Sequence, residues 1–491
     1  MNRSNNCRTQ IWLVLCIALL LGAGLAPAQS TGKRPVIIIP GITGSKLENP
    51  RTGKTVWFNV KRDKEDDLRL PMTSTILAQN KDSLEATDII RTIGLGLPLI
   101  PDIEVYQTVI DALEARGYKE ADWKHPKAAD VYYVFAYDWR RDNVESAHLL
   151  MRKITAAKAA MRRPDLKFDI LAHSMGGLVA RYAAMYGMAD LPREGAKPVP
   201  NWSGAAHIGK LLMFGTPNEG SMSSLDAITN GYPIIAERKL PFVDDLRPED
   251  VLTSPSIFEL LPHGASNRFL DENLQPIQVD IYNPETWNKY GWGAINDPKF
   301  LSKLRDAARL AETNKDIKPV KLKKDANLDD KLIARTTYAQ IKAYFATVLN
   351  RARRFHQALD VAVDKAPIQI YAYGGNCQPT LDAAVLVRDD KKDKWQTLFS
   401  SRDIKTADNK IIKKDDVKAA IYALGDGRVT QHSLLTTAEP VKNGGDTVPT
   451  GTLFPLTATF FGCVSHTKLF LDKPIQDSFL SALVVEKKGQ P

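Results

Sequence analysis

Cysteine is scarce in this chain: only Cys7, Cys16, Cys377 and Cys463 occur in 491 residues. No group of cysteines and histidines has the spacing of a zinc site, which excludes the common zinc-binding modules. Arginine-rich, zinc-finger and stacking-aromatic patterns are missing too, so the sequence predicts no nucleic-acid partner. Internal repeats are absent. What is present is 44% hydrophobic and 25% charged residues, the composition of a globular protein with a large core.

Long hydrophobic runs are confined to the N-terminus. One such run extends from Ile11 to Leu25, and it is short for a membrane span. Arg3 and Arg8 precede it, and the small-residue sequence A-P-A at 26–28 follows it. This order is typical of a secretory signal peptide. We therefore predict an exported protein, secreted or periplasmic, that is cleaved after Ala28; an uncleaved membrane anchor is the alternative.

Export changes what the cysteines and the charge mean. Cys7 and Cys16 leave with the signal peptide, and Cys377 and Cys463 remain for one disulfide in an oxidising compartment. Two buried free thiols are the alternative. Cleavage removes two arginines from a formal net charge of +9, so the mature chain stays mildly basic. That charge suits a peripheral anionic membrane surface, and equally a solvated surface without a partner.

The most informative segment is KFDILAHSMGGL at 167–178. An apolar strand pattern leads directly to Ser174, and a helical pattern follows. Small residues, Ala172 and Gly176, flank the serine two positions away on each side. A serine on such a strand-to-helix turn is the nucleophile elbow of an α/β-hydrolase, although a βα turn can contain S-x-G by chance. The Met175 N–H, at the start of the helix, can then help to stabilise an oxyanion.

A serine nucleophile needs a base, and His466 is the best candidate. It follows a predicted last strand at 458–462 and precedes a helical pattern, which is where the histidine of this fold lies. A role in a surface loop is the alternative. His173 adjoins the serine, but we expect its side chain to point away from the Ser174 hydroxyl.

Two aspartates compete for the position of the acid. Asp426 lies in GDGRV, and Asp446 lies in GGDTVP. Asp426 is favoured because it leaves room for a helix before the last strand, but both sequences also resemble ordinary turns. A second oxyanion donor should come from the loop after an early strand, where the Ile42 N–H of P-G-I is the candidate. This chemistry requires no metal and no organic cofactor.

Strand and helix patterns alternate along most of the chain, which predicts a parallel sheet with right-handed crossovers. We expect a first part of the α/β-hydrolase core at 29–217, with a lid region at about 49–100. Residues 218–365 interrupt the alternation and are interpreted as a cap insertion. Residues 366–491 complete the core, to which we expect residues 423–429 to return as a strand. The fold class expected is an α/β-hydrolase with a mostly parallel sheet flanked by helices.

Taken together, these segments resemble the lecithin:cholesterol acyltransferase family, which includes lysosomal phospholipase A2 and the phospholipid:diacylglycerol acyltransferases. The matching sequences are RPVIIIPGITGSKLE (34–48), FAYDWRRD (135–142), LAHSMGGLVARY (171–182), MFGTPNEGS (213–221), IQIYAYGGNCQPT (368–380), GDGRV (425–429) and GCVSHTKLF (462–470). The resemblance implies Ser174 as nucleophile, Asp426 as acid, His466 as base, and Ile42 and Met175 as oxyanion donors. Ala172 departs from the family's frequent glycine, and the region around Trp57 lacks the cysteine pair that closes the family's lid.

The function that this resemblance implies is serine-dependent acyl transfer from a glycerophospholipid to water or to an alcohol, such as a sterol. A triacylglycerol lipase or carboxylesterase is an alternative, and so is a non-enzymatic membrane-binding protein with a hydrolase-like fold. We also expect the cap aromatics Trp287, Tyr290 and Trp292 to be exposed and to favour action at a lipid interface.

Overall fold

A computed structural model of the chain describes residues 33–59, 67–93, 103–232, 246–300, 302, 338–389, 393–436 and 454–484. The predicted signal peptide lies outside these ranges, and so does Asp446. Residues 34–491 belong to one compact unit. Within the described residues, no helix combines the length and the apolarity that crossing a bilayer requires.

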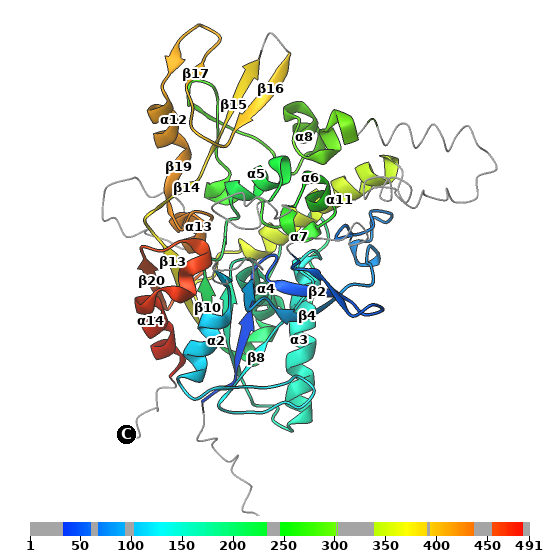
Figure 1. Ribbon diagram of the computed structural model, residues 1–491, viewed down its shortest axis with the longest axis vertical. Coiled ribbons are helices and arrows are strands. Elements are labelled where there is room, and N and C mark those ends of the chain that lie inside the picture. The colour runs from blue at the N-terminus through cyan, green and yellow to red at the C-terminus, as the bar shows by residue number, and fades with distance from the viewer. Residues whose placement is uncertain are drawn as a thin grey trace, which may run out of the picture. The chain divides into compact units, whose positions relative to one another are not determined.

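The core of the described residues is a sheet of seven strands, and each neighbouring pair in it is parallel. Their order across the sheet is β20 (Ala458–Gly462), β13 (Gln369–Gly375), β10 (Ile208–Phe214), β9 (Phe168–His173), β1 (Val36–Ile39), β8 (Val131–Val134) and β7 (Lys119–Glu120). The predicted parallel sheet is therefore confirmed, with β9 at its centre and β1 beside it. Figure 1 labels its strands β8, β10, β13 and β20.

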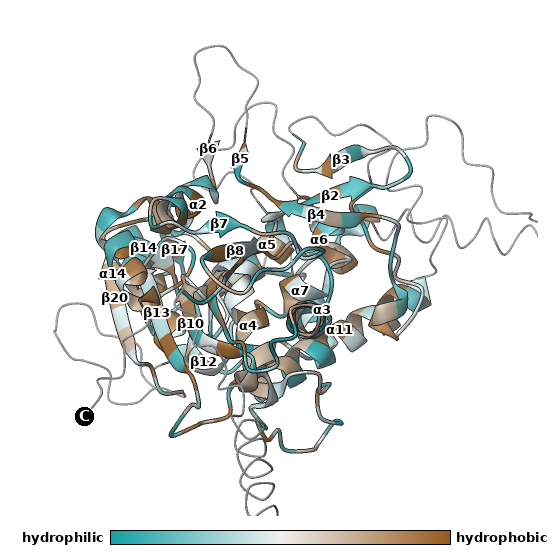
Figure 2. Cartoon of the chain, turned by 90° about the horizontal axis from the view of Figure 1, so that it is seen from below, coloured by the Kyte–Doolittle hydropathy of each residue, from teal (hydrophilic) through white to brown (hydrophobic). Residues whose placement is uncertain are grey.

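Both faces of this sheet are apolar, as a parallel sheet covered by helices requires. On one face, Val36 and Ile38 of β1 belong to the cluster that α2 (Gln107–Glu114) and α14 (Lys473–Leu483) complete. On the other face, Ile37 and Ile39 belong to the cluster of α3 (Asn143–Ala160) and α4 (Met175–Tyr186). Figure 2 shows these two helix pairs on opposite sides of the strands. The alternation of side chains along β1 thus produces a three-layer core.

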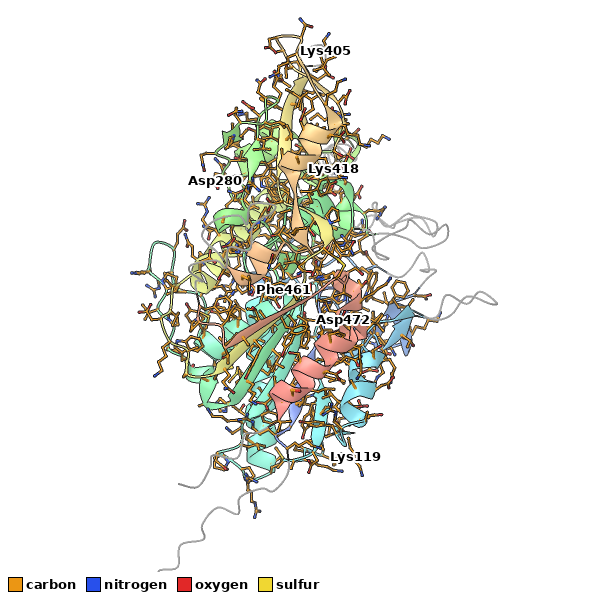
Figure 3. All side chains as sticks on the ribbon, turned by 90° about the vertical axis from the view of Figure 1, so that its left-hand side faces the viewer. Lys119, Asp280, Lys405, Lys418, Phe461 and Asp472 are labelled. Carbon is orange, nitrogen blue, oxygen red and sulfur yellow. A yellow bond between two sulfur atoms is a disulfide. The ribbon has the colours of Figure 1, made fainter. Side chains whose placement is uncertain are left out.

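The strand at one edge of the sheet, β20, leads into the segment that contains His466, here called the histidine loop (residues 463–471). β20 ends at Gly462, and the chain passes through a 3-10 helix, His466–Leu471, into α14. Asp472 caps α14 by accepting a hydrogen bond from the Ile475 N–H at 2.9 Å. Figure 3 shows Phe461 on β20 and Asp472 at the start of α14, which packs against the strand. The predicted last strand and closing helix are both present.

Most of the chain between β10 and β13 is helical where it is described. The elements are α5 (Met222–Asn230), α6 (Pro248–Leu252), α7 (Pro255–Phe258), α8 (Pro284–Tyr290), α11 (Tyr338–Leu359), two-residue strands β11 (Phe269–Leu270) and β12 (Pro276–Ile277), and 3-10 helices at Gly264–Ser266 and Ala294–Asn296. β11 pairs with β15 (Ala384–Asp389), which forms a hairpin with β16 (Lys394–Leu398). The boundary at residue 365 stays a prediction, because this sheet joins strands from both sides of it.

One predicted core strand was placed wrongly. We expected residues 423–429 to return to the core, but β19 (Tyr422–Gly425) pairs antiparallel with β14 (Gln378–Leu381) in a separate two-stranded sheet. The elements around it are β17 (Ile404–Lys405), β18 (Ile411–Ile412), α12 (Lys414–Ile421) and α13 (Gln431–Leu435). Asp426 therefore follows a small accessory sheet and not a strand of the central one.

The predicted lid region contains regular structure where it is described. β2 (Ser45–Asn49), β3 (Lys54–Trp57) and β4 (Glu85–Ile89) form a three-stranded antiparallel sheet, and β5 (Thr92–Ile93) pairs with β6 (Ile103–Glu104). A short 3-10 helix also lies in this region, at Leu77–Gln79. Another, at Ser203–Ala206, lies outside it, between α4 and β10.

The expectation of exposed cap aromatics was wrong for both tryptophans. Trp287 and Trp292 are 0% exposed, and Tyr290 is half-buried. The Trp287 ring nitrogen donates to the carbonyl of Ile281 at 2.6 Å, and that of Trp292 donates to the Thr397 hydroxyl at 2.7 Å. Each indole thus buries its ring and satisfies its N–H inside the protein, so these side chains pack the cap instead of forming a lipid-binding surface.

Candidate active site

Ser174 lies on a strained turn between β9 and α4. Its backbone has φ 52° and ψ −128°, a region that a residue with a side chain rarely occupies. Two hydrogen bonds hold it there: the Ser174 N–H donates to the Phe214 carbonyl at 2.7 Å, and the Ser174 carbonyl accepts from the Gly177 N–H at 2.9 Å. The strand, turn and helix that the sequence predicted around this serine are all present.

Glycines bring the loop after β1 against this turn. A Cβ added at Gly176 would lie 2.5 Å from the Pro40 carbonyl oxygen, and one added at Gly41 would lie 2.8 Å from the Ser174 Cβ. Both distances are too short for a carbon atom, so neither position has room for a side chain. The absence of side chains is what allows the loop and the serine to approach each other.

This approach places two backbone donors beside the serine. Ile42 follows Gly41 in the loop, and Met175 is the first residue of α4. No hydrogen bond from either N–H to an acceptor is found among the described residues. Unpaired N–H groups near a nucleophile are what an oxyanion hole requires. Ile42 and Met175 stay the candidates for that role.

His466 and Asp426 are directly joined. The His466 Nδ1 is 2.7 Å from the Asp426 Oδ2, and the His466 N–H donates to the Asp426 carbonyl at 2.8 Å. Because a carboxylate only accepts, Nδ1 carries the proton and Nε2 keeps its lone pair. Gly215, at φ 57°, passes so close that an added Cβ would lie 2.9 Å from both the carboxylate and the ring.

The second oxygen of Asp426 is held by the backbone. Its Oδ1 accepts from the Arg428 N–H at 2.9 Å and from the Val429 N–H at 2.7 Å, and the residue is 2% exposed. Both oxygens of the buried carboxylate are therefore paired, and the carboxylate is fixed toward His466. Asp446 lies outside the described residues, so the structure supplies geometry only for Asp426.

A buried chain of hydrogen bonds links the loop after β1 to the loop that contains His466. Sequence reasoning missed this chain. The Gly41 N–H donates to the Tyr106 hydroxyl at 2.8 Å, and that oxygen is 2.9 Å from the His173 Nδ1. The other ring nitrogen of His173, Nε2, is 3.1 Å from the His466 carbonyl. A carbonyl only accepts, so Nε2 carries the proton and Tyr106 donates to Nδ1.

Burial sets the charge state of His173. Desolvation lowers the pKa of this histidine to about 3, with His466 adding to the effect. Burial also raises the pKa of Tyr106 above its ordinary value. His173 is therefore neutral at neutral pH, and it adds no positive charge beside the His466 ring, whose centroid is 4.9 Å away. The expectation that His173 merely points away from the serine missed this contact.

Ser174, His466 and Ile42 line one cavity of about 230 Å³. Much of the remaining wall is apolar. It includes Ile90, which follows β4, and Val105, which precedes α2. An apolar cavity with a few convergent polar groups is the usual form of a small-molecule site. In the described part of the chain no group of His, Cys, Asp and Glu side chains is arranged to hold a metal ion.

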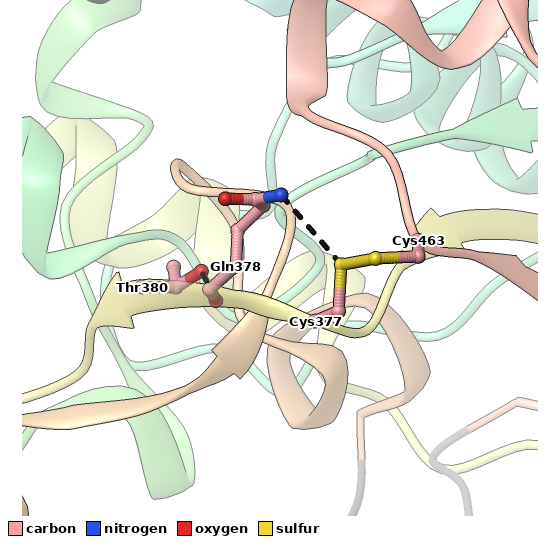
Figure 4. The surroundings of a disulfide bond; sticks show 4 residues. All are labelled: Cys377, Gln378, Thr380 and Cys463. Carbon is pink, nitrogen blue, oxygen red and sulfur yellow. Dashed lines mark hydrogen bonds between the residues drawn. A yellow bond between two sulfur atoms is a disulfide. The ribbon is translucent and has the colours of Figure 1, made fainter.

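A disulfide braces the histidine loop. Cys377 and Cys463 are bonded, with their Cα atoms 5.1 Å apart, as the sequence predicted (Figure 4). Cys377 follows β13 and Cys463 follows β20, so the bond joins the ends of two adjacent parallel strands. Cys463 precedes His466 by three positions, so the bond ties the segment of His466 to the edge of the sheet.

The model of the lecithin:cholesterol acyltransferase family matches residues 84–443. A comparison with curated proteins gave no match. Among solved structures, a chain of the Tle4–Tli4 complex is 15% identical at a TM-score of 0.48, over 92% of this chain and 97% of that one. The mature Bacillus licheniformis lipase BlEst2 is 10% identical at a TM-score of 0.29, over 94% and 95% of the two chains. EstA from Clostridium botulinum is 11% identical at a TM-score of 0.31, over 93% and 88%.

The family match covers well over half of the chain, and it includes the serine elbow and the Asp426 loop. The chain therefore belongs to the lecithin:cholesterol acyltransferase family, a family of lipid ester hydrolases and acyltransferases with the α/β-hydrolase fold.

Proposed function

We propose that this protein is an exported phospholipase A and acyltransferase that forms an acyl ester on Ser174. The observation that carries the proposal is that Ser174, on its strained elbow, and His466, which is bonded to Asp426, line one largely apolar cavity. Family membership supplies the substrate class, which is a lipid ester. Within that class we propose glycerophospholipids as acyl donors.

The proposed reaction has two balanced halves. His466 Nε2 takes the Ser174 hydroxyl proton as the oxygen attacks the ester carbonyl, and the Ile42 and Met175 N–H groups stabilise the tetrahedral oxyanion. The intermediate then collapses, and His466 returns the proton to the departing glycerol oxygen. In the second half, water or an alcohol attacks the acyl-serine in the same way, which releases a fatty acid or a new ester and restores Ser174.

Asp426 orients the base and stabilises its charged form. Its carboxylate holds His466 in the tautomer that leaves Nε2 unprotonated, and it offsets the imidazolium charge that forms during attack. Neutral His173 supports the same step, because a second charged ring at 4.9 Å would oppose that imidazolium.

The test is mass-spectrometric lipid profiling. Purified mature protein and its Ser174→Ala variant are incubated with a phosphatidylcholine, with and without a sterol or another alcohol. We expect lysophospholipid with free fatty acid or a new ester from the wild type, and neither from Ser174→Ala. Hydrolysis of triacylglycerol alone would favour an ordinary lipase, and turnover of no ester would favour a non-catalytic lipid-binding protein.

Export and action at membranes are further parts of the proposal. The mature N-terminus, read by mass spectrometry, should begin after Ala28. The mild basic charge and the apolar cavity support action on lipid aggregates. We expect faster turnover of long-chain phospholipid in vesicles than of short-chain soluble esters, and a decrease when salt screens anionic vesicles. Equal rates in all conditions would contradict interfacial action.

A further inference from the structure

Two cations lie at the cavity that contains Ser174. Among the described residues that line it, Arg428 and Lys468 carry the only formal charges besides the titratable histidines, and none of the lining residues is acidic. We propose that Arg428 and Lys468 bind the phosphodiester of the substrate and so select phospholipids over uncharged glycerides. This inference rests on the proposed function, because it assigns a substrate group to the same site.

Arg428 is fixed next to the candidate acid. Its N–H donates to the Asp426 carboxylate at 2.9 Å, and its carbonyl accepts from the Ser221 hydroxyl at 2.6 Å. The guanidinium lies over the ring of Tyr232, 5.4 Å from the centroid, and Tyr232 lines the cavity as well. Backbone bonds and a cation–π contact therefore hold this charge at the cavity.

Among the described residues, the Arg428 guanidinium has no hydrogen-bond acceptor. The charge of Arg428 affects the pKa of Asp226. Burial raises that pKa, and the positive charge of Arg428 opposes the rise. Within the described residues, however, the Arg428 side chain makes no ion pair. A guanidinium offers five N–H donors in a planar fork that fits phosphate oxygens, so a phosphodiester can satisfy donors that the described residues leave open.

Lys468 supplies the second charge from the opposite loop. It lies two residues after His466 in the 3-10 helix, where its N–H donates to the Ser465 carbonyl at 2.9 Å. Its side chain is exposed and makes no ion pair with a described residue. One cation thus follows the candidate acid by two residues, the other follows the candidate base by two residues, and both line the cavity that contains Ser174.

The chemistry of a glycerophospholipid matches this placement. Only a few single bonds separate its phosphate from the carbonyl carbon of either fatty acyl ester. When that carbonyl is at Ser174, the phosphate must lie close by, while an acyl chain can contact apolar wall such as Ile90 and Val105. Diacylglycerol has the same esters and no phosphate. A released fatty acid is a second anion that these cations could hold, and the two sources are separable.

The experiment measures substrate preference. Arg428→Gln, Lys468→Gln and the double variant are assayed on phosphatidylcholine and on diacylglycerol with identical acyl chains, each at one fixed mole fraction in uncharged detergent micelles. Arg193→Gln, an exposed position outside the cavity, is the matched control. We expect the ratio of kcat/KM for phosphatidylcholine over diacylglycerol to fall about tenfold for each cation removed, because each loses a charge-assisted hydrogen bond. The control should keep the wild-type ratio.

Each outcome has a defined meaning. An unchanged ratio, or an equal fall on both substrates, overturns phosphate binding while leaving an active esterase. If the ratio is unchanged but the variants weaken inhibition by added fatty acid, the cations hold the carboxylate product, which also overturns the inference. Failure of the proposed function shows itself separately, because the wild type would then leave phosphatidylcholine uncleaved, whether or not it cleaves diacylglycerol.

Discussion

Acid should destabilise this protein through His173, and the effect can be measured against a variant. This histidine is buried beside Ser174 and bonded on both ring nitrogens, by the Tyr106 hydroxyl and to the His466 carbonyl. Protonation would place a donor at Nδ1 against a hydroxyl that donates to it, and a charge in a fully buried site, where the attraction of Asp426 does not offset the desolvation. Burial therefore lowers the His173 pKa to about 3.

The sign and size of the effect follow from proton linkage. A histidine in the unfolded chain has a pKa of about 6.5, so between that value and pH 3 the unfolded state binds a proton that the folded state does not. Stability is thus present above pH 6.5 and is lost as the pH falls. Between pH 8 and pH 5 the loss is about 2 kcal/mol. Because pH 5 is well above the folded pKa, this figure holds for any folded pKa below about 4.

The assay is urea unfolding of the mature wild type and of His173→Asn at several pH values between 5 and 8. The variant starts less stable, since it loses the bond to His466. Its free energy of unfolding should nevertheless fall by about 2 kcal/mol less than that of the wild type over this range. Other groups, including the buried His356, titrate in both proteins and cancel in the difference. Parallel curves for the two proteins would refute the argument.

Three further predictions concern the same site. Asp426→Asn should lower kcat on the order of 10⁴-fold with the fold intact by circular dichroism, because asparagine cannot stabilise the His466 imidazolium; a larger loss from Asp446→Asn would contradict this. Tyr106→Phe should lower kcat more than it raises KM, and lower the free energy of unfolding by about 1–3 kcal/mol, since two buried partners lose their bonds; a stability loss at unchanged kcat would make the contact purely structural. Replacing Cys377 and Cys463 by serine should lower the unfolding free energy in urea by about 2–4 kcal/mol, because the bond closes a loop over a sequence separation of 86, and equal midpoints for the variant and the oxidised wild type would contradict it.

The parts of the candidate site that the sequence could predict are those whose signals are local. The strand, serine and helix at 168–186 are contiguous, and their pattern is the elbow itself. His466 is marked by a strand before it and a helical pattern after it. Asp426 is marked by the glycines of its turn, although the pattern alone left Asp446 open. In each case a few neighbouring residues determine the local conformation. The order serine, acid, histidine along the chain then indicates which role each residue would have in this fold.

The parts that sequence reasoning missed depend on partners far along the chain. Tyr106 and His173 are 67 positions apart, and nothing near either residue predicts their bond. Trp292 is buried because a hydroxyl from the β15–β16 hairpin, 105 positions away, receives its N–H. The stretch after Tyr422 looked like a core strand because short apolar runs do not reveal which sheet they join.

The one departure from the family pattern at the elbow has a physical explanation. Ala172 stands where glycine is frequent, two residues before the serine, yet the turn is formed. Its position on β9 is in register with Ile39 of β1 and Met213 of β10, and its methyl group packs in the apolar layer of α3 and α4. A small apolar side chain is accommodated there. On the other side of the serine, a methyl group at Gly176 would lie 2.5 Å from a carbonyl oxygen of the loop after β1. Position 176, where that loop crosses the elbow, therefore has no room for a side chain, whereas alanine at 172 is compatible with the turn that is observed.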